Sequence, residues 1–211
     1  MLIVALTGGI ASGKSVVAKI LEELGCYIHR ADKIAHDLME PEKPAWKKIV
    51  AHFGAKILNE DKTINRTLLG KIVFSDEEER RFLNELIHPL VLEKKKEVIN
   101  RLEQEGHYHI FISEAALTIE AGFADFFDKI IMTYCKKEVQ IERLMERDGI
   151  SRKQAIKIMK SQMQPQEKLK YADYVIDTSG SLQSSIEQTE RVYRNLMIEN
   201  EMKDTAAKYK S

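Results

Sequence analysis

A lysine and a serine stand side by side near the N-terminus, directly after a glycine-rich turn. The turn covers residues 8–13, and Lys14 and Ser15 follow it. Glycines let the backbone curl so that several N–H groups point at one anion, and a lysine adds positive charge beside them. A serine hydroxyl in this position can bind the Mg²⁺ that accompanies a phosphate chain. These residue types together predict chemistry on the phosphates of a nucleotide.

The spacing of these residues matches G-x-x-x-x-G-K-[ST], the P-loop pattern. An apolar run over residues 2–6 precedes the turn, and residues 16–25 carry apolar side chains at helical spacing. A glycine-rich turn that merely joins a strand to a helix is the alternative, but eight positions fit in the required strand–loop–helix context. We therefore expect a bound nucleoside triphosphate with Lys14 on its β- and γ-phosphates and Ser15 on the metal. The residues expected to contact it are Gly9, Ile10, Ala11, Ser12, Gly13, Lys14, Ser15 and Val16.

Asp32 is the first of the other candidate catalytic residues. It follows a short apolar segment, residues 26–29, that we interpret as a second strand. A carboxylate at the end of such a strand can accept a proton from a substrate hydroxyl. Asp32 can equally be the N-cap of a helix expected over residues 33–39, because aspartate is favoured at that position.

Arg143 and Arg147 are four residues apart in a strongly charged segment. On a helix this spacing places both guanidinium groups on one face, where they can bind phosphate oxygens in pairs. The alternative is a solvent-exposed helix in which Glu142 and Glu146 are the ion-pair partners of the arginines.

Length and composition restrict the class of protein. The chain has 211 residues, of which 44% are hydrophobic and 31% charged, as expected for one soluble globular domain. Lysine plus arginine and aspartate plus glutamate are equal at 33 each, so no overall charge attracts nucleic acid or an anionic membrane. No apolar stretch is long enough to span a membrane. Cys26 and Cys135 form no metal-ligand pattern, and we expect buried thiols in a reducing compartment, the cytoplasm.

The elements that must position these residues alternate between strand and helix. We expect strands over residues 2–6, 26–29, 108–113, 129–135 and 174–177. This alternation predicts an α/β fold with a five-stranded parallel sheet, right-handed crossovers and helices on both faces. In such folds the ligand binds at the C-terminal ends of the strands.

Two helical segments interrupt this pattern within a single domain, 1–211. The core sheet is expected from residues 1–39, 106–137 and 171–200, a substrate-side helical insertion at about 40–105 and a lid at about 138–170. Ser75 with Glu78 and Ser151 with Gln154 fit capping boxes that begin helices. The first helix runs towards Gly106, and Pro89 is expected to kink or divide it. The second is expected to run to about residue 164, and the lid has few apolar anchors.

The motifs, taken in order, resemble those of the dephospho-coenzyme A kinases, a P-loop kinase family. The resemblance spans residues 2 to about 180. It rests on residues 6–15, Ala31-Asp32-x-Ile34-Ala35, Arg66-x-x-Leu69, Leu83-Asn84, His88-Pro89, Arg143-Leu144-x-x-Arg147-Asp148, Gln162, Glu167-Lys168, Ala172-Asp173 and Val175-Ile176.

The resemblance implies that ATP, with Mg²⁺, phosphorylates the ribose 3′-hydroxyl of dephospho-coenzyme A in the last step of coenzyme A biosynthesis. It implies catalytic roles for Lys14, Asp32, Arg143 and Arg147. It also implies that Arg66 and His88, with Asp32, contact the acceptor substrate. Neither nucleic acid nor a membrane is an expected partner, and the sequence carries no signal for oligomeric state.

The chain departs from the family pattern at three places. Arg30 stands where an aspartate is usual, two residues before Asp32. Residues 116–120, beginning with Ala116, replace a segment that usually holds proline and leucine. Thr178 replaces an asparagine after the last strand. Two alternatives remain: another small-molecule or nucleotide P-loop kinase, and a nucleotide-dependent switch. The chain has no Asn-Lys-x-Asp or Thr-Lys-x-Asp guanine-reading motif, which disfavours a GTPase switch.

Overall fold

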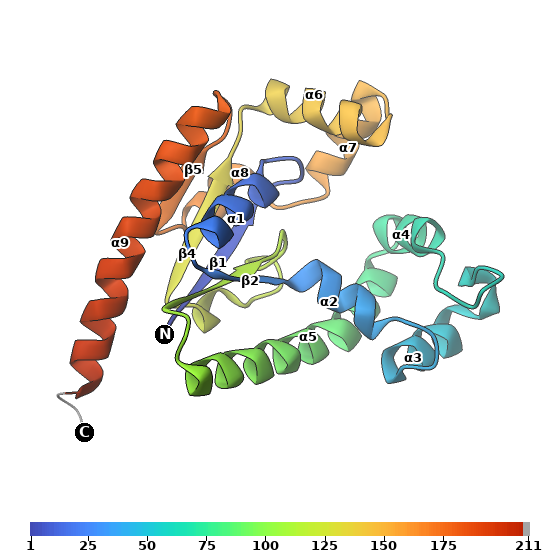
Figure 1. Cartoon of the computed structure of the whole chain (residues 1–211). Helices are drawn as coiled ribbons and strands as arrows, with labels where there is room; N and C mark the ends of the chain where they lie inside the picture. Colours follow the sequence, from blue (N-terminus) through green and yellow to red (C-terminus); the bar gives the residue numbers. More distant parts are fainter. Residues whose placement is uncertain (209–211) are drawn as a thin grey trace. The chain divides into compact units, whose positions relative to one another are not determined.

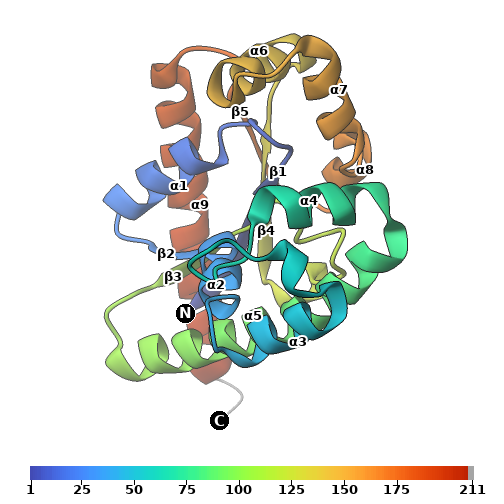
Figure 2. The same cartoon turned by 90° about the vertical axis from the view of Figure 1, so that its right-hand side faces the viewer.

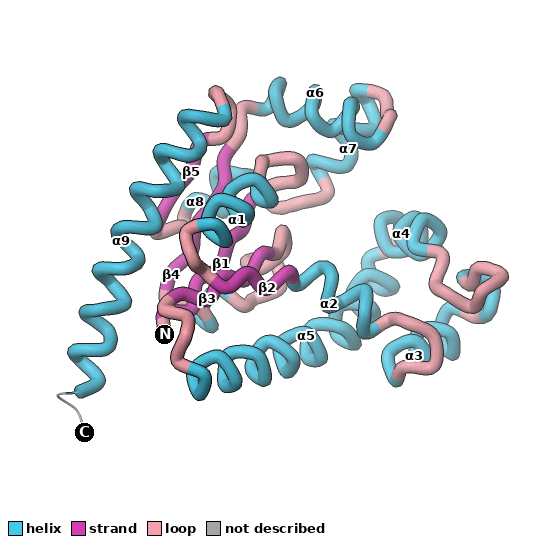
Figure 3. Tube along the Cα trace, viewed as in Figure 1, coloured by secondary structure: helices cyan, strands magenta, loops and turns pink. Residues whose placement is uncertain are grey.

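The structure is a computed structural model that describes residues 1–208, and its centre is a five-stranded parallel sheet. The strands lie in the order β2-β3-β1-β4-β5, and every neighbouring pair is parallel (Figure 3). Their bounds are β1 Leu2–Gly8, β2 Tyr27–Arg30, β3 Ile110–Glu114, β4 Lys129–Tyr134 and β5 Tyr174–Asp177. The predicted α/β class and the five predicted strands are confirmed.

Helices connect the strands along the chain, and two of them, α1 and α9, cover one face of the sheet (Figure 1). The helices are α1 Lys14–Glu23, α2 Ala31–Leu38, α3 Pro44–Phe53, α4 Arg66–Ser75, α5 Glu77–Glu105, α6 Lys137–Asp148, α7 Arg152–Lys160, α8 Pro165–Leu169 and α9 Leu182–Lys208, with short 3-10 helices η1 Ala55–Ile57 and η2 Ala124–Phe126. Within residues 1–208, no helix is both long and apolar enough to cross a membrane.

Alternation along β1 explains how the sheet is covered on both faces. Leu2, Val4 and Leu6 point into the main apolar core, which they share with side chains of α1 and α9. Ile3 and Ala5 point the other way and pack against the segment around η2. Both faces of the central strand are therefore buried, as its uninterrupted apolar sequence predicts. The C-terminal ends of the strands remain as the place for a site.

The described chain divides into two compact units. The sheet unit contains residues 1–30 and the residues from 101 onward, and the helical unit is Ala31–Asn100. The predicted insertion over 40–105 falls mainly in the helical unit, which also includes α2. Its own apolar core is built around Trp46, Ile49 and Ile57.

One prediction about a helix end in the helical region is wrong. Ser75 does not cap α5; it is the last residue of α4, and its hydroxyl donates to the carbonyls of Lys71 and Ile72. Asp76 is the acceptor instead, because its Oδ1 receives the N–H groups of Glu78 at 2.9 Å and Glu79 at 3.3 Å. Pro89 lies inside α5, so it does not divide the helix, and the kink that it is expected to cause stays a prediction.

The predicted capping box at Ser151 is confirmed, since both of its reciprocal bonds with Gln154 are present. The helix that it starts ends earlier than predicted, at Lys160, and α8 is a separate helix that begins at Pro165. The prediction of few apolar anchors in the segment 138–170 is also wrong. Ile141, Leu144 and Ala155 are buried there, in a cluster that includes side chains of the P-loop itself. Both cysteines are buried, as predicted.

Candidate active site

The glycine-rich turn joins the end of β1 to the start of α1. Gly13 is the N-cap of α1 with a φ of 82°, and the helix receives no side-chain cap. The first-turn N–H groups of α1 can therefore bind an anion, which the helix dipole also favours. A Cβ on Gly8 would lie 2.2 Å from Thr133 Oγ1, so this turn tolerates only glycine where it passes β4. Tight packing thus gives the turn its shape.

Lys14 lies folded over the turn that precedes it. Its Nζ donates to the carbonyl of Gly8 at 3.0 Å and to that of Gly9 at 2.9 Å. These bonds hold a positive charge at the mouth of the loop, where a phosphate chain would need it. Of the other predicted nucleotide contacts, Val16 is exposed, whereas Ser12 is buried with its hydroxyl on Thr133 Oγ1 at 2.7 Å. Ser12 can therefore contribute its backbone but not its side chain.

Ser15 faces a carboxylate at the end of a neighbouring strand. Its Oγ donates to Glu114 Oε1 at 2.9 Å, and Arg30 Nε lies 3.9 Å from Glu114 Oε2. A hydroxyl and a carboxylate side by side are oxygen ligands that suit Mg²⁺, which keeps several waters and phosphate oxygens as its remaining ligands. Among the described residues no group of three or more His, Cys, Asp or Glu could hold a metal. The donor set thus fits a metal shared with a phosphate.

Arg30, at one of the positions that depart from the family pattern, has a structural partner. Its guanidinium donates to both carboxylate oxygens of Glu22, at 2.7 and 3.3 Å. This hydrogen bond, rather than burial, holds the pKa of Glu22 below its usual value. Arg30 therefore joins α1 to the end of β2, beside the Ser15–Glu114 pair.

Thr178 is another position that departs from the family pattern, and its side chain contacts the P-loop. Its hydroxyl donates to the carbonyl of Ser12 at 2.9 Å, and a Cβ on Gly13 would lie 3.0 Å from Thr178 Oγ1. Arg143 binds the same residue, with NH2 on the Thr178 carbonyl at 2.7 Å and NH1 on its hydroxyl at 3.2 Å. Arg143 is therefore fixed against the loop after β5.

Arg147 has a different partner from Arg143. Its guanidinium makes two bonds to the Asp148 carboxylate, at 2.7 and 2.9 Å, and it is exposed. That hydrogen bond raises the pKa of Arg147 and lowers the pKa of Asp148. The two arginines are thus held by separate groups, and Asp148 rather than Glu142 or Glu146 is the partner in the structure.

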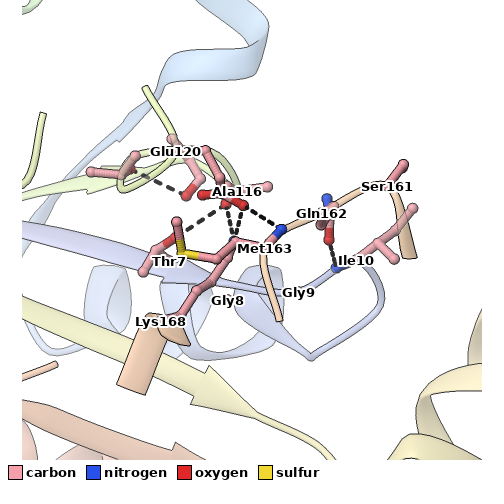
Figure 4. Close-up of polar contacts among 12 residues, drawn as sticks. Thr7, Gly8, Gly9, Ile10, Ala116, Glu120, Ser161, Gln162, Met163 and Lys168 are labelled. Atoms are coloured by element: carbon pink, nitrogen blue, oxygen red, sulfur yellow. Dashed lines mark hydrogen bonds and ion pairs between the residues drawn. The ribbon is translucent and has the colours of Figure 1, made fainter. Parts of the chain in front are cut away.

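Two glutamines that no motif singled out for a role hold the peptide groups of Ile10. Gln162 Oε1 accepts the N–H of Ile10 at 2.8 Å (Figure 4), and Gln140 Nε2 donates to the carbonyl of Ile10. Gln162 belongs to the resembling segment, but its partner is 152 residues away in the chain. A local pattern has no signal for such a contact, and Gln140 was missed altogether.

The predicted acceptor residues lie in the helical unit. Asp32 is exposed in the first turn of α2, inside the helix rather than at its N-cap. His36 follows one turn later, and its Nδ1 accepts from Arg66 NH1 at 3.0 Å. Burial, and next the charge of Arg66, lower the pKa of His36. The sequence analysis missed this neighbour, which contacts Arg66 and lies one helical turn from Asp32.

His88 lies on α5 in the same unit and is half-buried. Burial lowers the pKa of its imidazole. A neutral imidazole at pH 7 can donate one hydrogen bond and accept another. His88 is therefore suited to a polar contact with a substrate, and it carries no charge with which to bind a phosphate.

Comparison with known proteins identifies the family. The family model described as dephospho-CoA kinase matches residues 2–184. A dephospho-CoA kinase of Carboxydothermus hydrogenoformans is 45% identical over 186 residues, covering 88% of this chain and 90% of the relative. A solved dephospho-CoA kinase from Campylobacter jejuni has a TM-score of 0.68 at 32% identity, covering 94% of this chain and 98% of that one. A crystal structure of a Thermus thermophilus protein has a TM-score of 0.79 at 27% identity, covering 92% and 96%. With its P-loop, its parallel sheet and its matched length, the chain belongs to the dephospho-CoA kinase family.

Proposed function

We propose that this protein transfers the γ-phosphate of ATP to the ribose 3′-hydroxyl of dephospho-coenzyme A, giving coenzyme A and ADP. The observation that carries the proposal is the P-loop, with Lys14 held over it and Ser15 beside Glu114, in a chain of this family. The family match favours this acceptor over that of another small-molecule kinase. It also favours an enzyme over a nucleotide-dependent switch.

The loop and its neighbours would bind and orient the triphosphate. Phosphoryl transfer requires little covalent work from a protein, so alignment and charge stabilisation dominate. Lys14 would exchange its carbonyl partners for β- and γ-phosphate oxygens, and Arg143 would add positive charge from the side of Thr178. Arg147 is exposed, and it would break its hydrogen bonds to Asp148 in order to bind the phosphates. The remaining contacts would come from backbone N–H groups of residues 9–16.

Ser15 and Glu114 would hold Mg²⁺ between them, directly or through water. The ion would supply charge that neutralises the phosphate oxygens and keeps the triphosphate in one orientation. Arg30, close to Glu114, would orient the carboxylate towards Ser15.

The acceptor would contact residues of the helical unit. Asp32 would accept or orient the proton of the 3′-hydroxyl, as a carboxylate within hydrogen-bond reach can. Arg66 would bind an anionic group of dephospho-coenzyme A, and His88 would make a neutral polar contact. We assign the helical insertion to acceptor binding, the segment 138–170 to a lid, and the protein to the cytoplasm, where buried unpaired thiols persist.

The test is to measure ATP consumption with and without dephospho-coenzyme A. We expect ADP to form only with the acceptor, in equal amount to a product phosphorylated at the 3′ position. Adenosine and pantetheine supplied separately should give no turnover. ATP consumption that does not depend on the acceptor would contradict the proposal, as would a product phosphorylated elsewhere.

A further inference from the structure

Lys168, on α8, is a buried cation away from the residues proposed for catalysis. Its side chain is 1% exposed, its Nζ pairs with Glu120 Oε1 at 2.7 Å, and it donates to the carbonyl of Ala116 at 2.7 Å (Figure 4). Taking a lysine and a glutamate out of water is costly, and an apolar pair of the same volume is often at least as stable. Glu120 Oε2 is also buried and accepts no hydrogen bond within the described residues. Stability alone therefore explains this pair poorly.

The pair joins two segments that lie far apart in the chain. Ala116 and Glu120 belong to the loop after β3, and Lys168 belongs to the segment that returns from α7 to β5, visible in Figure 2 as α8 below α7. Ala116 also accepts the hydroxyl of Thr7, the penultimate residue of β1, at 3.2 Å. Glu120 Oε1 also accepts the N–H of Met163 at 3.3 Å. These bonds fix the backbone at Met163 relative to the end of β1.

Fixing Met163 fixes the residue before it. Gln162 accepts the N–H of Ile10 at 2.8 Å, and Gln140 donates to the carbonyl of Ile10, so both peptide groups that flank Ile10 are oriented. The next residue, Ala11, has a φ of 55°. That left-handed conformation is unfavourable for a residue with a Cβ, so it needs support from its surroundings.

Apolar packing supplies part of this support, because Ile10 and Ala11 contact the cluster around Leu144. A cavity of about 200 Å³ adjoins Gly9, Gln140 and Gln162, so side chains do not fill this side of the loop. A Cβ on Gly9 would lie 2.7 Å from Gln140 Nε2, so glycine here is what allows Gln140 to approach. Hydrogen bonds to the two glutamines therefore position the peptide groups of Ile10 on this side of the loop.

We propose that Lys168, Glu120 and Gln162 are positioning residues that set the conformation of the P-loop for nucleotide binding. The buried Lys168–Glu120 ion pair fixes the segment between α7 and β5. The hydrogen bond of Gln162, in that segment, then orients the Ile10 peptide. The proposal deepens the proposed function and rests on it only in assigning the loop to a nucleotide. The role belongs to binding and alignment, since none of the three side chains need touch the phosphates.

The test compares variants of the full chain in two measurements, the affinity for ADP by calorimetry and the backbone amide resonance of Ile10 by NMR. Gln162→Leu removes the acceptor, and Gln162→Glu retains one. Lys168→Met removes the buried charge, and Lys170→Met is its control, because Lys170 is an exposed lysine two residues away. We expect Gln162→Leu and Lys168→Met to move the Ile10 resonance and weaken ADP binding about tenfold, the loss expected for about one hydrogen bond.

The matched variants should behave differently: Gln162→Glu, which keeps an acceptor, should move the Ile10 resonance less than Gln162→Leu, and Lys170→Met should stay close to the original protein. In steady-state turnover, KM for ATP should rise more than KM for the acceptor. An unchanged Ile10 resonance and unchanged ADP affinity in Gln162→Leu would overturn the proposal, even if Lys168→Met fails to fold. If the original protein binds ADP but does not phosphorylate dephospho-coenzyme A, the proposed function fails while these binding measurements still decide the positioning role.

Discussion

At the scale of single residues, the polar side chains near the loop are held mainly by backbone atoms. Lys14 binds two carbonyls, Thr178 donates to the carbonyl of Ser12, and Arg143 donates to the carbonyl of Thr178. Such bonds fix a side chain without using another charged group, so the positive charges keep their capacity to attract phosphate. The Ser15–Glu114 pair joins two side chains instead, and it has the chemistry of a metal site.

Lys14→Ala should nearly abolish turnover while the fold persists. Loss of one electrostatic contact to a developing charge commonly lowers the rate by about 10²–10³. Lys19→Ala is the matched control, because Lys19 is on the same helix with a side chain 76% exposed. The measurements are kcat and the melting temperature of both variants. Near-normal turnover in Lys14→Ala would remove the P-loop from the mechanism.

Asp32→Asn should bind ATP normally and transfer phosphate at least about 10²-fold more slowly, the lower range for acid–base residues. Asparagine has nearly the same shape as aspartate but cannot take up the proton. Asp37→Asn, on the same exposed helix, is the control. Single-turnover kinetics separate transfer from product release. If Asp32→Asn retains full turnover with unchanged stability, the base lies elsewhere.

Acidification should weaken acceptor binding through His36. Its pKa is lowered from 6.5, first by burial and then by Arg66, while Asp32 and Asp37 oppose the shift. The unfolded chain therefore takes up the proton first as pH falls. The contribution to stability is present above about pH 6.5 and is lost as pH falls through the folded pKa. Protonation of Nδ1 also removes the acceptor for Arg66.

The measurement is KM for dephospho-coenzyme A from about pH 8 to about pH 5, where histidine titrates. KM should rise on the acid side in the original protein and rise less in His36→Gln. Burial lowers the pKa of His88 as well, so this residue is one source of the dependence that remains in the variant. Identical profiles in the two proteins would show that His36 does not govern Arg66.

At the scale of elements, local patterns predicted most of the sheet unit. The strands were recognisable from apolar runs, and the capping box at Ser151 from a hydroxyl and an amide three residues apart. The same rule failed at Ser75, because a serine hydroxyl can instead bond the carbonyls one turn back, and Asp76 was available to cap the next helix. Gln140 could not be found, since its partner Ile10 is 130 residues away in the chain. Contacts of that kind depend on tertiary packing, which no spacing rule describes.

The segment 138–165 should become more protected from amide exchange when ATP and the acceptor bind. Its apolar cluster around Leu144 contains Ile10 and Ala11, so ordering of the P-loop should stabilise α6 and α7 directly. Exchange measured by mass spectrometry should slow more in this segment than in β1, β3 and β4. Equal protection with and without ligands would mean that the segment is a fixed helical layer and not a lid.

At the scale of the whole molecule, the main apolar core packs α1, near the start of the chain, against α9, near its end. Val17 and Leu21 of α1 share a cluster with Val192 and Leu196 of α9, on one face of the sheet. The composition showed that acidic and basic residues are equal in number. The sequence around the two cysteines predicted that their thiols are buried. The division of the described chain into a sheet unit and a helical unit was only partly visible, because α2 follows β2 without a break in the sequence.

Cys26 lies in this core and should report on its opening. It is 3% exposed, between the end of α1 and the start of β2, and burial raises the pKa of its thiol to about 12. The thiolate is the reactive form, so in the folded protein at pH 8 only on the order of 10⁻⁴ of this thiol is reactive. Labelling by a thiol reagent therefore requires the core to open.

Cys135→Ser leaves Cys26 as the single thiol and keeps an acceptor for Arg143, whose NH1 donates to Cys135 Sγ at 3.5 Å. In this variant a thiol reagent should label Cys26 slowly, at a rate that follows the population of the opened core. Saturation with ATP at about 100 times its dissociation constant should slow labelling about 100-fold, because binding stabilises the folded state by mass action. As a control, Cys26→Ser is added to the Cys135→Ser variant, which then has no thiol and shows whether any other site reacts. Rapid labelling of a protein whose circular dichroism spectrum is unchanged would mean that α1 moves away from β2 without unfolding. The helix that follows the P-loop would then be mobile.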